Sequence, residues 1–106
     1  MVDRVAKDAL YDGFAEVAKA LASGRRAEIV DVLAQGERSV EEVAGEIDQS
    51  VANTSHHLRA LARAGLLTTR RDGTRIYYAL AGDRVGELWA AVGTVAEAHV
   101  AGVVVV

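Results

Sequence analysis

The stretch SVANTSHHLRALARAGLLTTRRDGTRIYYAL, residues 50–80, changes its hydrophobic pattern part-way, and this change decides the fold. In its first half, apolar residues recur three and four positions apart, which is typical of an amphipathic helix. After Gly65 the apolar residues alternate with polar ones, which is typical of β-strands, and Asp72-Gly73 separates two β-prone runs. Asp-Gly favours the positive φ angles of a two-residue hairpin turn. The stretch therefore predicts a helix over residues 51–64 followed by a β-hairpin over residues 66–80.

A second short helix is predicted immediately upstream. Ser39 stands three residues before Glu42, the spacing of a capping box, and apolar residues at helical spacing follow over residues 40–47. Residues 48–50 then form a short connection that ends in a serine placed to cap the next helix. Two short helices joined in this way, residues 40–64 together, are a candidate helix-turn-helix. The pattern is weak on its own, because any helical hairpin in a bundle shows it.

Further helices are predicted over about residues 8–22, over residues 25–34 and from residue 83 onward, and the first and last of these carry long apolar stripes. A short chain with such stripes would gain stability by forming a dimer. The stripes consist of Leu10, Phe14, Val17, Ala18 and Leu21, and of Val85, Leu88, Trp89, Val92, Val95, Ala96 and His99. In the helix over residues 51–64, the side expected to face the core consists of Val51, Thr54, Leu58, Leu61 and Ala62.

The composition, 51% hydrophobic and 25% charged over 106 residues, is typical of one compact domain. No cysteine occurs in the sequence, which excludes disulfides, thiolate metal sites and thiol redox sensing. The N-terminal residues lack the apolar core of a signal peptide, and the closing valines are far fewer than the roughly 20 apolar residues that span a bilayer. We therefore expect a cytoplasmic protein, a single domain over residues 1–106, with no membrane partner.

Positive charge is concentrated in one part of an otherwise acidic chain. The net charge is −3, yet residues 50–80 contain five arginines against one aspartate, whereas residues 1–49 contain 6 Lys/Arg and 11 Asp/Glu. A local basic patch on an acidic body is typical of a phosphate-binding surface. A solvated charged surface without a partner is the alternative, and charge alone does not separate the two.

The side of the 51–64 helix that faces away from the expected core carries short hydrogen-bonding groups and cations, which suit a helix that enters the major groove of DNA. Asn53 and His56 are the candidates for reading bases. Ser50 and Ser55 would bond phosphate oxygens and Arg59 would reach the DNA backbone, while three arginines at the hairpin tip would reach flanking phosphates or the minor groove. For His57 a structural hydrogen bond within the motif is an equal alternative. The candidate DNA-binding residues are Ser50, Asn53, Ser55, His56, His57, Arg59, Arg70, Arg71 and Arg75.

Neither a metal site nor a catalytic site is expected. Adjacent histidines such as His56 and His57 point about 100° apart on a helix and chelate one ion poorly. His99 is a single imidazole on an apolar stripe, so a structural role explains it better than a metal site with Glu97 and Asp83. A serine and a histidine on a protruding helix lack the pocket that catalysis needs. We therefore expect no enzyme activity and no cofactor.

Three segments, ALASGRRAEIVDVLAQGERSVEEVAGEI, SHHLRALARAGLL and RRDGTRIYYAL, resemble the ArsR/SmtB family of winged-helix repressors over about residues 20–80. The combination of Ser-x-His-Leu, Leu-x-x-Ala-Gly-Leu and Arg-Asp-Gly-x-x-x-Tyr-Tyr-x-Leu is specific. The resemblance implies a winged helix-turn-helix that forms a homodimer through its first and last helices, here residues 1–22 and 83–101. It also implies that the dimer binds double-stranded operator DNA near a promoter and is released by an inducer.

Departures from the family pattern bear on the inducer and on base readout. Metal-sensing members carry Cys-x-Cys at the start of the third helix, where this chain has Ser39 and Glu41. Other members bind metal in the last helix with more histidines than His99 supplies, so control by a metal, sulfur or redox inducer does not carry over and the inducer is unknown. The family often has Gln and Ser at the positions of Val51 and Ala52. The region up to His99 also resembles the DNA-binding half of members fused to a rhodanese domain.

The sequence therefore predicts a mainly α fold with a small antiparallel β-hairpin, a dimeric winged helix-turn-helix that acts as a sequence-specific transcriptional repressor. The alternative is a winged-helix module for protein interaction or dimerisation that binds no specific DNA. Salt separates the two predictions, because only binding to many phosphates makes affinity fall steeply with ionic strength.

Overall fold

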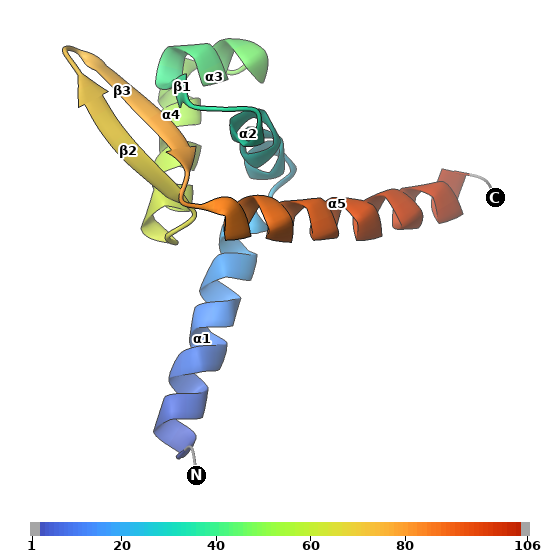
Figure 1. Cartoon of the computed structure of the whole chain (residues 1–106). Coiled ribbons are helices and arrows are strands. Elements are labelled where there is room, and N and C mark those ends of the chain that lie inside the picture. Colours follow the sequence, from blue (N-terminus) through green and yellow to red (C-terminus); the bar gives the residue numbers. More distant parts are fainter. Residues whose placement is uncertain (1–2, 105–106) are drawn as a thin grey trace.

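The computed structural model describes residues 3–104 and contains five helices and three strands within them. The fold is mainly α, and its one sheet is small. Because a helix-turn-helix is followed directly by a β-hairpin, the fold is a winged helix-turn-helix (Figure 1). The elements in chain order are α1 (Arg4–Leu21), α2 (Gly24–Ala34), β1 (Arg38–Ser39), α3 (Val40–Glu46), α4 (Val51–Arg63), β2 (Leu67–Asp72), β3 (Arg75–Leu80) and α5 (Asp83–Val104).

Polar residues at the helix starts explain where four of the helices begin. Asp3, Ser23, Ser39 and Ser50 each accept, with the side chain, the backbone amide three residues further on. The capping box predicted at Ser39 is present, since the Glu42 side chain also accepts the Ser39 amide at 3.0 Å. The first helix begins earlier than its apolar stripe indicates, because Asp3 already supplies a cap.

The hydrophobic core lies between α2, α3, α4 and the sheet. The prediction that Val51 belongs to this core is wrong, because its side chain is 48% exposed. Residues 51–53 are all exposed, so the first turn of α4 protrudes from the body and core contact begins at Thr54. The buried cluster consists of Ala20, Ile29, Val30, Val32, Leu33, Val40, Val43, Ile47, Leu58, Leu61, Leu66, Leu67 and Tyr78.

The wing is part of a three-stranded antiparallel sheet, whereas the sequence predicts two strands. The strand order is β1-β3-β2, and β1 pairs with β3 through Arg38 opposite Tyr78 and Ser39 opposite Tyr77. A strand of two residues has no periodicity that a sequence pattern can reveal. Its pairing nevertheless joins the start of α3 to the wing, because Ser39 is both a strand residue and the cap of α3.

The hairpin turn also differs from the expected Asp-Gly loop. Asp72 pairs with Arg75, so the two loop residues are Gly73 and Thr74. Gly73 has φ of 63°, and Thr74 is not among the described residues with positive φ. Glycine at the first loop position with positive φ there alone is typical of a type II′ turn. Asp72 therefore ends the strand instead of forming the turn.

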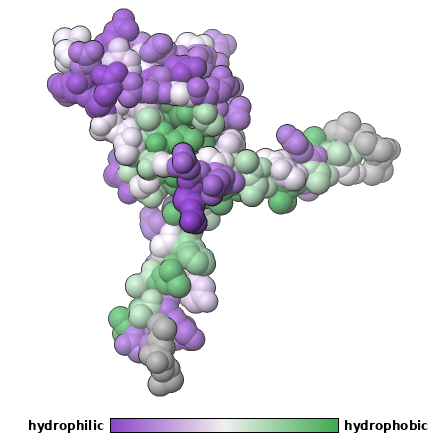
Figure 2. All heavy atoms as spheres, in the orientation of Figure 1, coloured by the Kyte–Doolittle hydropathy of each residue, from purple (hydrophilic) through white to green (hydrophobic). Residues whose placement is uncertain are grey.

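The helices α1 and α5 extend from the body as two arms, away from the tip of the wing (Figure 1). The surface of the body around α3 and the wing is hydrophilic, whereas apolar side chains follow the arms (Figure 2). Apart from Val51, every large apolar side chain that is exposed in the described part of the chain lies on an arm: Val5, Leu10, Tyr11, Phe14, Leu88, Val92, Val95 and Val100. None of the described helices combines the length and apolar character needed to cross a bilayer.

Candidate nucleic-acid interface

The connection between α3 and α4 is a tight turn with an uncommon backbone conformation. Asp48 has φ of 56°, the one positive φ outside glycine in residues 3–104. Aspartate tolerates this left-handed region better than most side chains. The Gln49 amide donates to the Ala44 carbonyl at 3.0 Å, which closes the end of α3. The turn thereby sets the direction in which α4 leaves the body.

The helix α4 has one buried face and one solvent face, as its sequence pattern predicts. Thr54, Leu58 and Leu61 are fully buried and fix the helix to the core. Asn53 and His56, the two candidates for reading bases, are exposed on the other face. The geometry therefore leaves both side chains accessible to a groove.

Gln49 is a residue of this surface that sequence reasoning missed. The Asn53 Nδ2 donates to the Gln49 Oε1 at 2.8 Å, and the Gln49 Nε2 donates to the Asp48 carbonyl at 3.0 Å. The spacing of four residues between a glutamine and an asparagine is a signal that could have revealed the pair. The Gln49 side chain accepts one of the two hydrogens of the Asn53 side-chain amide. This bond orients the amide and leaves the Asn53 Oδ1 free to accept a hydrogen bond.

The two serines of the predicted set have different surroundings. The Ser50 Oγ accepts a hydrogen bond from the Asn53 backbone amide at 3.0 Å, so this hydroxyl serves as the helix cap while its own hydrogen remains free to donate. Ser55 is half-buried, and its Oγ accepts a hydrogen bond from the Arg59 Nη1 at 2.7 Å. The bond holds the exposed guanidinium of Arg59 along α4, with further N–H donors that remain for a phosphate.

The two histidines lie in different environments. His56 is exposed, whereas His57 is half-buried, and their ring centroids are 5.7 Å apart. Burial and, after it, the nearby charge of Arg26 on α2 hold the pKa of His57 below its ordinary value. The structural hydrogen bond considered for His57 is not found at its buried Nδ1, which has no partner among residues 3–104. The lowered pKa therefore favours the neutral form of the His57 ring.

Acidification is expected to lower the free energy of unfolding through His57. Because its pKa is lower in the folded chain, the unfolded chain binds more protons once the pH falls through the ordinary histidine value of about 6.5. Stability is therefore lost as the pH falls from about 7 towards the lowered folded-state pKa. Urea unfolding at a neutral and a mildly acidic pH should show a smaller loss for His57→Gln than for the unmodified chain. Equal losses in the two chains would contradict this.

The three arginines near the wing tip do not share one face of the hairpin. Arg71 lies opposite Ile76, on the face that also carries the buried Tyr78, so Arg71 is on the side of the core and α4. Arg70 is one position along the strand and therefore lies on the other face, as does Arg75. The wing thus presents its cations on two sides of the ribbon.

Arg70 already has a partner. Its Nη2 donates to the Glu37 Oε1 at 2.8 Å, and its Nε lies 3.0 and 3.1 Å from the two carboxylate oxygens. The guanidinium carbon also lies 4.4 Å from the centre of the Tyr77 ring, a cation–π contact. The hydrogen bonds from Arg70 lower the pKa of the Glu37 carboxyl, and Glu37 in turn raises the pKa of Arg70. In contrast, no carboxylate within residues 3–104 forms an ion pair with Arg71 or Arg75.

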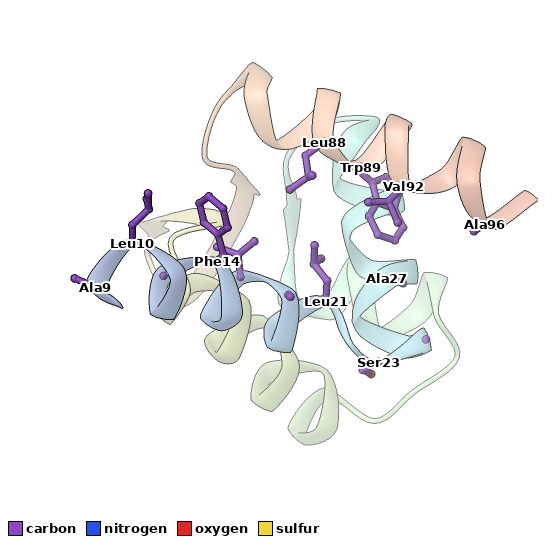
Figure 3. A pocket seen from close by; sticks show the side chains of 14 residues that line it. Ala9, Leu10, Phe14, Leu21, Ser23, Ala27, Leu88, Trp89, Val92 and Ala96 are labelled. Carbon is purple, nitrogen blue, oxygen red and sulfur yellow. The ribbon is translucent and has the colours of Figure 1, made fainter. Parts of the chain in front are cut away.

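The arms form a second surface, which is apolar. Side chains from α1 and α5 point towards a common space (Figure 3), an open groove of about 870 Å³. Val17 and Leu21 of α1 and Val85 and Trp89 of α5 pack partly against the core. Phe14 is further out on α1 and is 59% exposed. Met1 and Val2, which belong to the predicted dimer region, lie outside the described residues.

The described residues hold no cluster that would suit a metal ion. No group of three or more His, Asp or Glu side chains within residues 3–104 is gathered for coordination. His99 lies on α5 in a shallow apolar hollow with Val92 and Val95. The neighbours of His99 are therefore other residues of the apolar stripe on α5.

Comparisons with known proteins give the family. Residues 23–69, from the cap of α2 into β2, match the family model described as bacterial regulatory protein, arsR family. The uncharacterized HTH-type transcriptional regulator Rv0081 of Mycobacterium tuberculosis is 37% identical over 82 residues, which cover 76% of this chain and 72% of that protein. The chain belongs to the ArsR family.

Two further comparisons extend the ArsR match to most of the chain. The HTH-type transcriptional regulator Rv0324 of M. tuberculosis is 50% identical over 99 residues, which are 93% of this chain and 44% of that protein. The solved homodimeric winged helix-turn-helix DNA-binding domain (fragment 1–100) of Mb0332 from Mycobacterium bovis, a possible ArsR-family regulator, has a TM-score of 0.85 and 48% identity, over 93% of this chain and 90% of that one. This chain therefore spans less than half the length of Rv0324.

A serine that caps a helix stands at the first position of the ArsR-family cysteine metal site in this chain. Ser39 is fully buried and forms the capping box of α3, while Glu41 is exposed. The Ser39 Oγ accepts the Glu42 backbone amide at 3.1 Å. The serine therefore supports the fold at the position where metal-sensing members have a ligand.

Proposed function

We propose that the chain is the DNA-binding and dimerisation unit of a transcriptional regulator that binds double-stranded operator DNA and represses transcription. One observation carries the proposal. The start of α4 and the tip of the wing lie at one end of the molecule, whereas the apolar arms leave the other end (Figure 1), and the residues at the start of α4 are exposed. No catalytic step is part of this function, and the regulator acts in the bacterial cytoplasm, where the DNA is. Its inducer is unidentified.

The residues divide into two roles in this proposal. Asn53 and His56 contact base edges, because they are exposed near the start of α4, the part of a recognition helix that enters the major groove. Arg59, Arg71 and Arg75 contact phosphates, because none of them is paired with a carboxylate in the described part of the chain. Phosphate contacts fix the register, and base contacts select the sequence.

The partner that covers the arms is a second copy of this chain. The arms expose eight large apolar side chains, and gathered exposed apolar groups of this kind usually mark an interaction surface. The similar M. bovis domain is a homodimer, which supports the same assembly here. Two-fold symmetry would place two α4 helices on successive turns of a palindromic operator.

A salt titration tests the proposal against the alternative of a protein-interaction module. The probe is a duplex that the purified chain itself selects from a random pool, with a scrambled duplex as the reference. Six to ten phosphate contacts predict that affinity falls by about 10³ to 10⁵ between roughly 50 and 200 mM salt. Selection of no duplex above the scrambled reference would exclude sequence-specific DNA binding and favour the protein-interaction module.

The variants Arg71→Ala and Asn53→Ala are expected to affect binding in different ways. Arg71→Ala should weaken binding to the selected and scrambled duplexes alike and reduce the salt slope by about one. Asn53→Ala should leave the salt slope unchanged and cost about 1–3 kcal/mol on the selected duplex only. Fluorescence anisotropy with both duplexes measures the two effects. Identical behaviour of the two variants would contradict the division between phosphate and base contacts.

A further inference from the structure

Glu37 lies where a carboxylate is unexpected on a surface that binds a polyanion. It directly precedes β1, and its carboxylate reaches the Arg70 guanidinium on β2, 33 positions later in the chain. Tyr77 of β3, between these strands, lies beneath the guanidinium. The three side chains thus form one contact across the full width of the sheet, which we call the wing clasp: Glu37, Arg70 and Tyr77.

The wing clasp differs from an ordinary surface ion pair, which contributes little because two flexible side chains must be ordered for one contact. Three short N–H···O distances and the stack on Tyr77 restrict the guanidinium in both position and plane. The backbones at both ends are also held, because Arg70 pairs with Tyr77 in the sheet and the residue after Glu37 pairs with Tyr78. Only the two side chains therefore need to be ordered when the contact forms.

The wing clasp changes how many cations the wing offers to DNA. Arg71 and Arg75 have no ion-pair partner within residues 3–104, whereas Glu37 neutralises Arg70. If Arg70 turned to a phosphate, the three bonds would break and a bare carboxylate would remain beside the DNA. The pair therefore adds no net positive charge to the interface in either arrangement.

We propose that Glu37 is a positioning residue that weakens phosphate contact at the duplex interface, because it holds Arg70 across Tyr77 and so removes one cation from the phosphate-binding set of the wing. This inference rests on the proposed function. A phosphate contact strengthens binding to every sequence alike. Removing one such contact lowers affinity for operator and non-operator DNA by the same factor and leaves base readout unchanged.

The test is the salt dependence of duplex binding by Glu37→Gln. The amide keeps the size of the side chain but releases the charge of Arg70, so the slope of log affinity against log salt should steepen by about 0.9, the value for one phosphate. Affinity for the selected and scrambled duplexes should rise alike, by about tenfold at low salt, so the ratio between them should not change. The matched control is Glu87→Gln on α5, which changes net charge equally and removes the partner of Arg84 at 3.9 Å. This control should keep the original slope.

The double variant Glu37→Gln with Arg70→Gln distinguishes charge from structure. It removes the released cation, so the slope should return to that of the unmodified chain. A slope of Glu37→Gln equal to that of Glu87→Gln would overturn the inference, as would a double variant whose slope is shallower than that of the unmodified chain. If the unmodified chain binds no duplex, the proposed function and this inference both fail. If it binds and only the Glu37 variants disagree, the inference alone fails.

Discussion

A chain carrying Phe14→Glu is expected to be a monomer at concentrations where the unmodified chain is a dimer. Phe14 is 59% exposed and lines the groove between the arms together with Leu88 and Val92 (Figure 3). Each proposed dimer buries two copies of this ring, and loss of a buried phenylalanine costs about 3–5 kcal/mol per site. Two sites give at least about 6 kcal/mol, which weakens the dimer by about four powers of ten.

Light scattering after size-exclusion chromatography measures the dimer, and anisotropy with the selected duplex measures the consequence for DNA binding. A monomer places one α4 helix on one half-site, so its affinity should fall together with the dimer population. Lys19→Gln is the matched control, because it lowers net charge by the same unit and lies about 140° around α1 from Phe14. If the Phe14→Glu chain stays dimeric, the dimer interface does not lie on the arms.

The variant Leu58→Ala is expected to lose about 2–5 kcal/mol of unfolding free energy. Leu58 is fully buried in the core cluster. The cost combines lost apolar burial with the cavity that remains, since close-packed surroundings relax only partly. A small domain has only about 5–15 kcal/mol in total, so this loss is a large part of its stability. Because Leu58 fixes α4 to the core, DNA binding should weaken as well.

Urea unfolding followed by circular dichroism measures the change in stability. The control is His56→Ala, a truncation in the same helix at an exposed side chain, which should change stability by less than about 0.5 kcal/mol. A similar loss in both variants would show that the solvent face of α4 carries structural contacts. In that case Asn53 and His56 would be less free for DNA than proposed.

Much of the helix-turn-helix and the hairpin was predictable from the sequence, because the signals for these elements are local. The capping box at Ser39, the cap at Ser50 and the spacing of Thr54, Leu58 and Leu61 each depend on residues within a few turns of one helix. The structure places α3, α4 and the hairpin within one or two residues of the predicted ranges. The accessibility of Asn53 and His56 follows from the same periodicity.

The errors and omissions have a common physical cause. The strand β1 exists because β3 pairs with it, and two residues carry no pattern of their own. Val51 has the right helical phase for the core, but the core does not reach the first turn of α4. Glu37 lies in a short connection far from Arg70 in the chain, so no spacing rule joins them. Each of these features depends on elements that meet only in the folded chain.

The sequence by itself determined the elements, their caps, the polar face of α4 and the place of the positive charge, because helix and hairpin formation depends on neighbouring residues. Only the tertiary structure decided which of those charges stays available, since sheet pairing brought Glu37 to Arg70 over Tyr77 and left Arg71 and Arg75 without an ion-pair partner in residues 3–104. The charge that an arginine offers to a partner depends on the groups that packing places beside it, and packing is not encoded in any short stretch of chain.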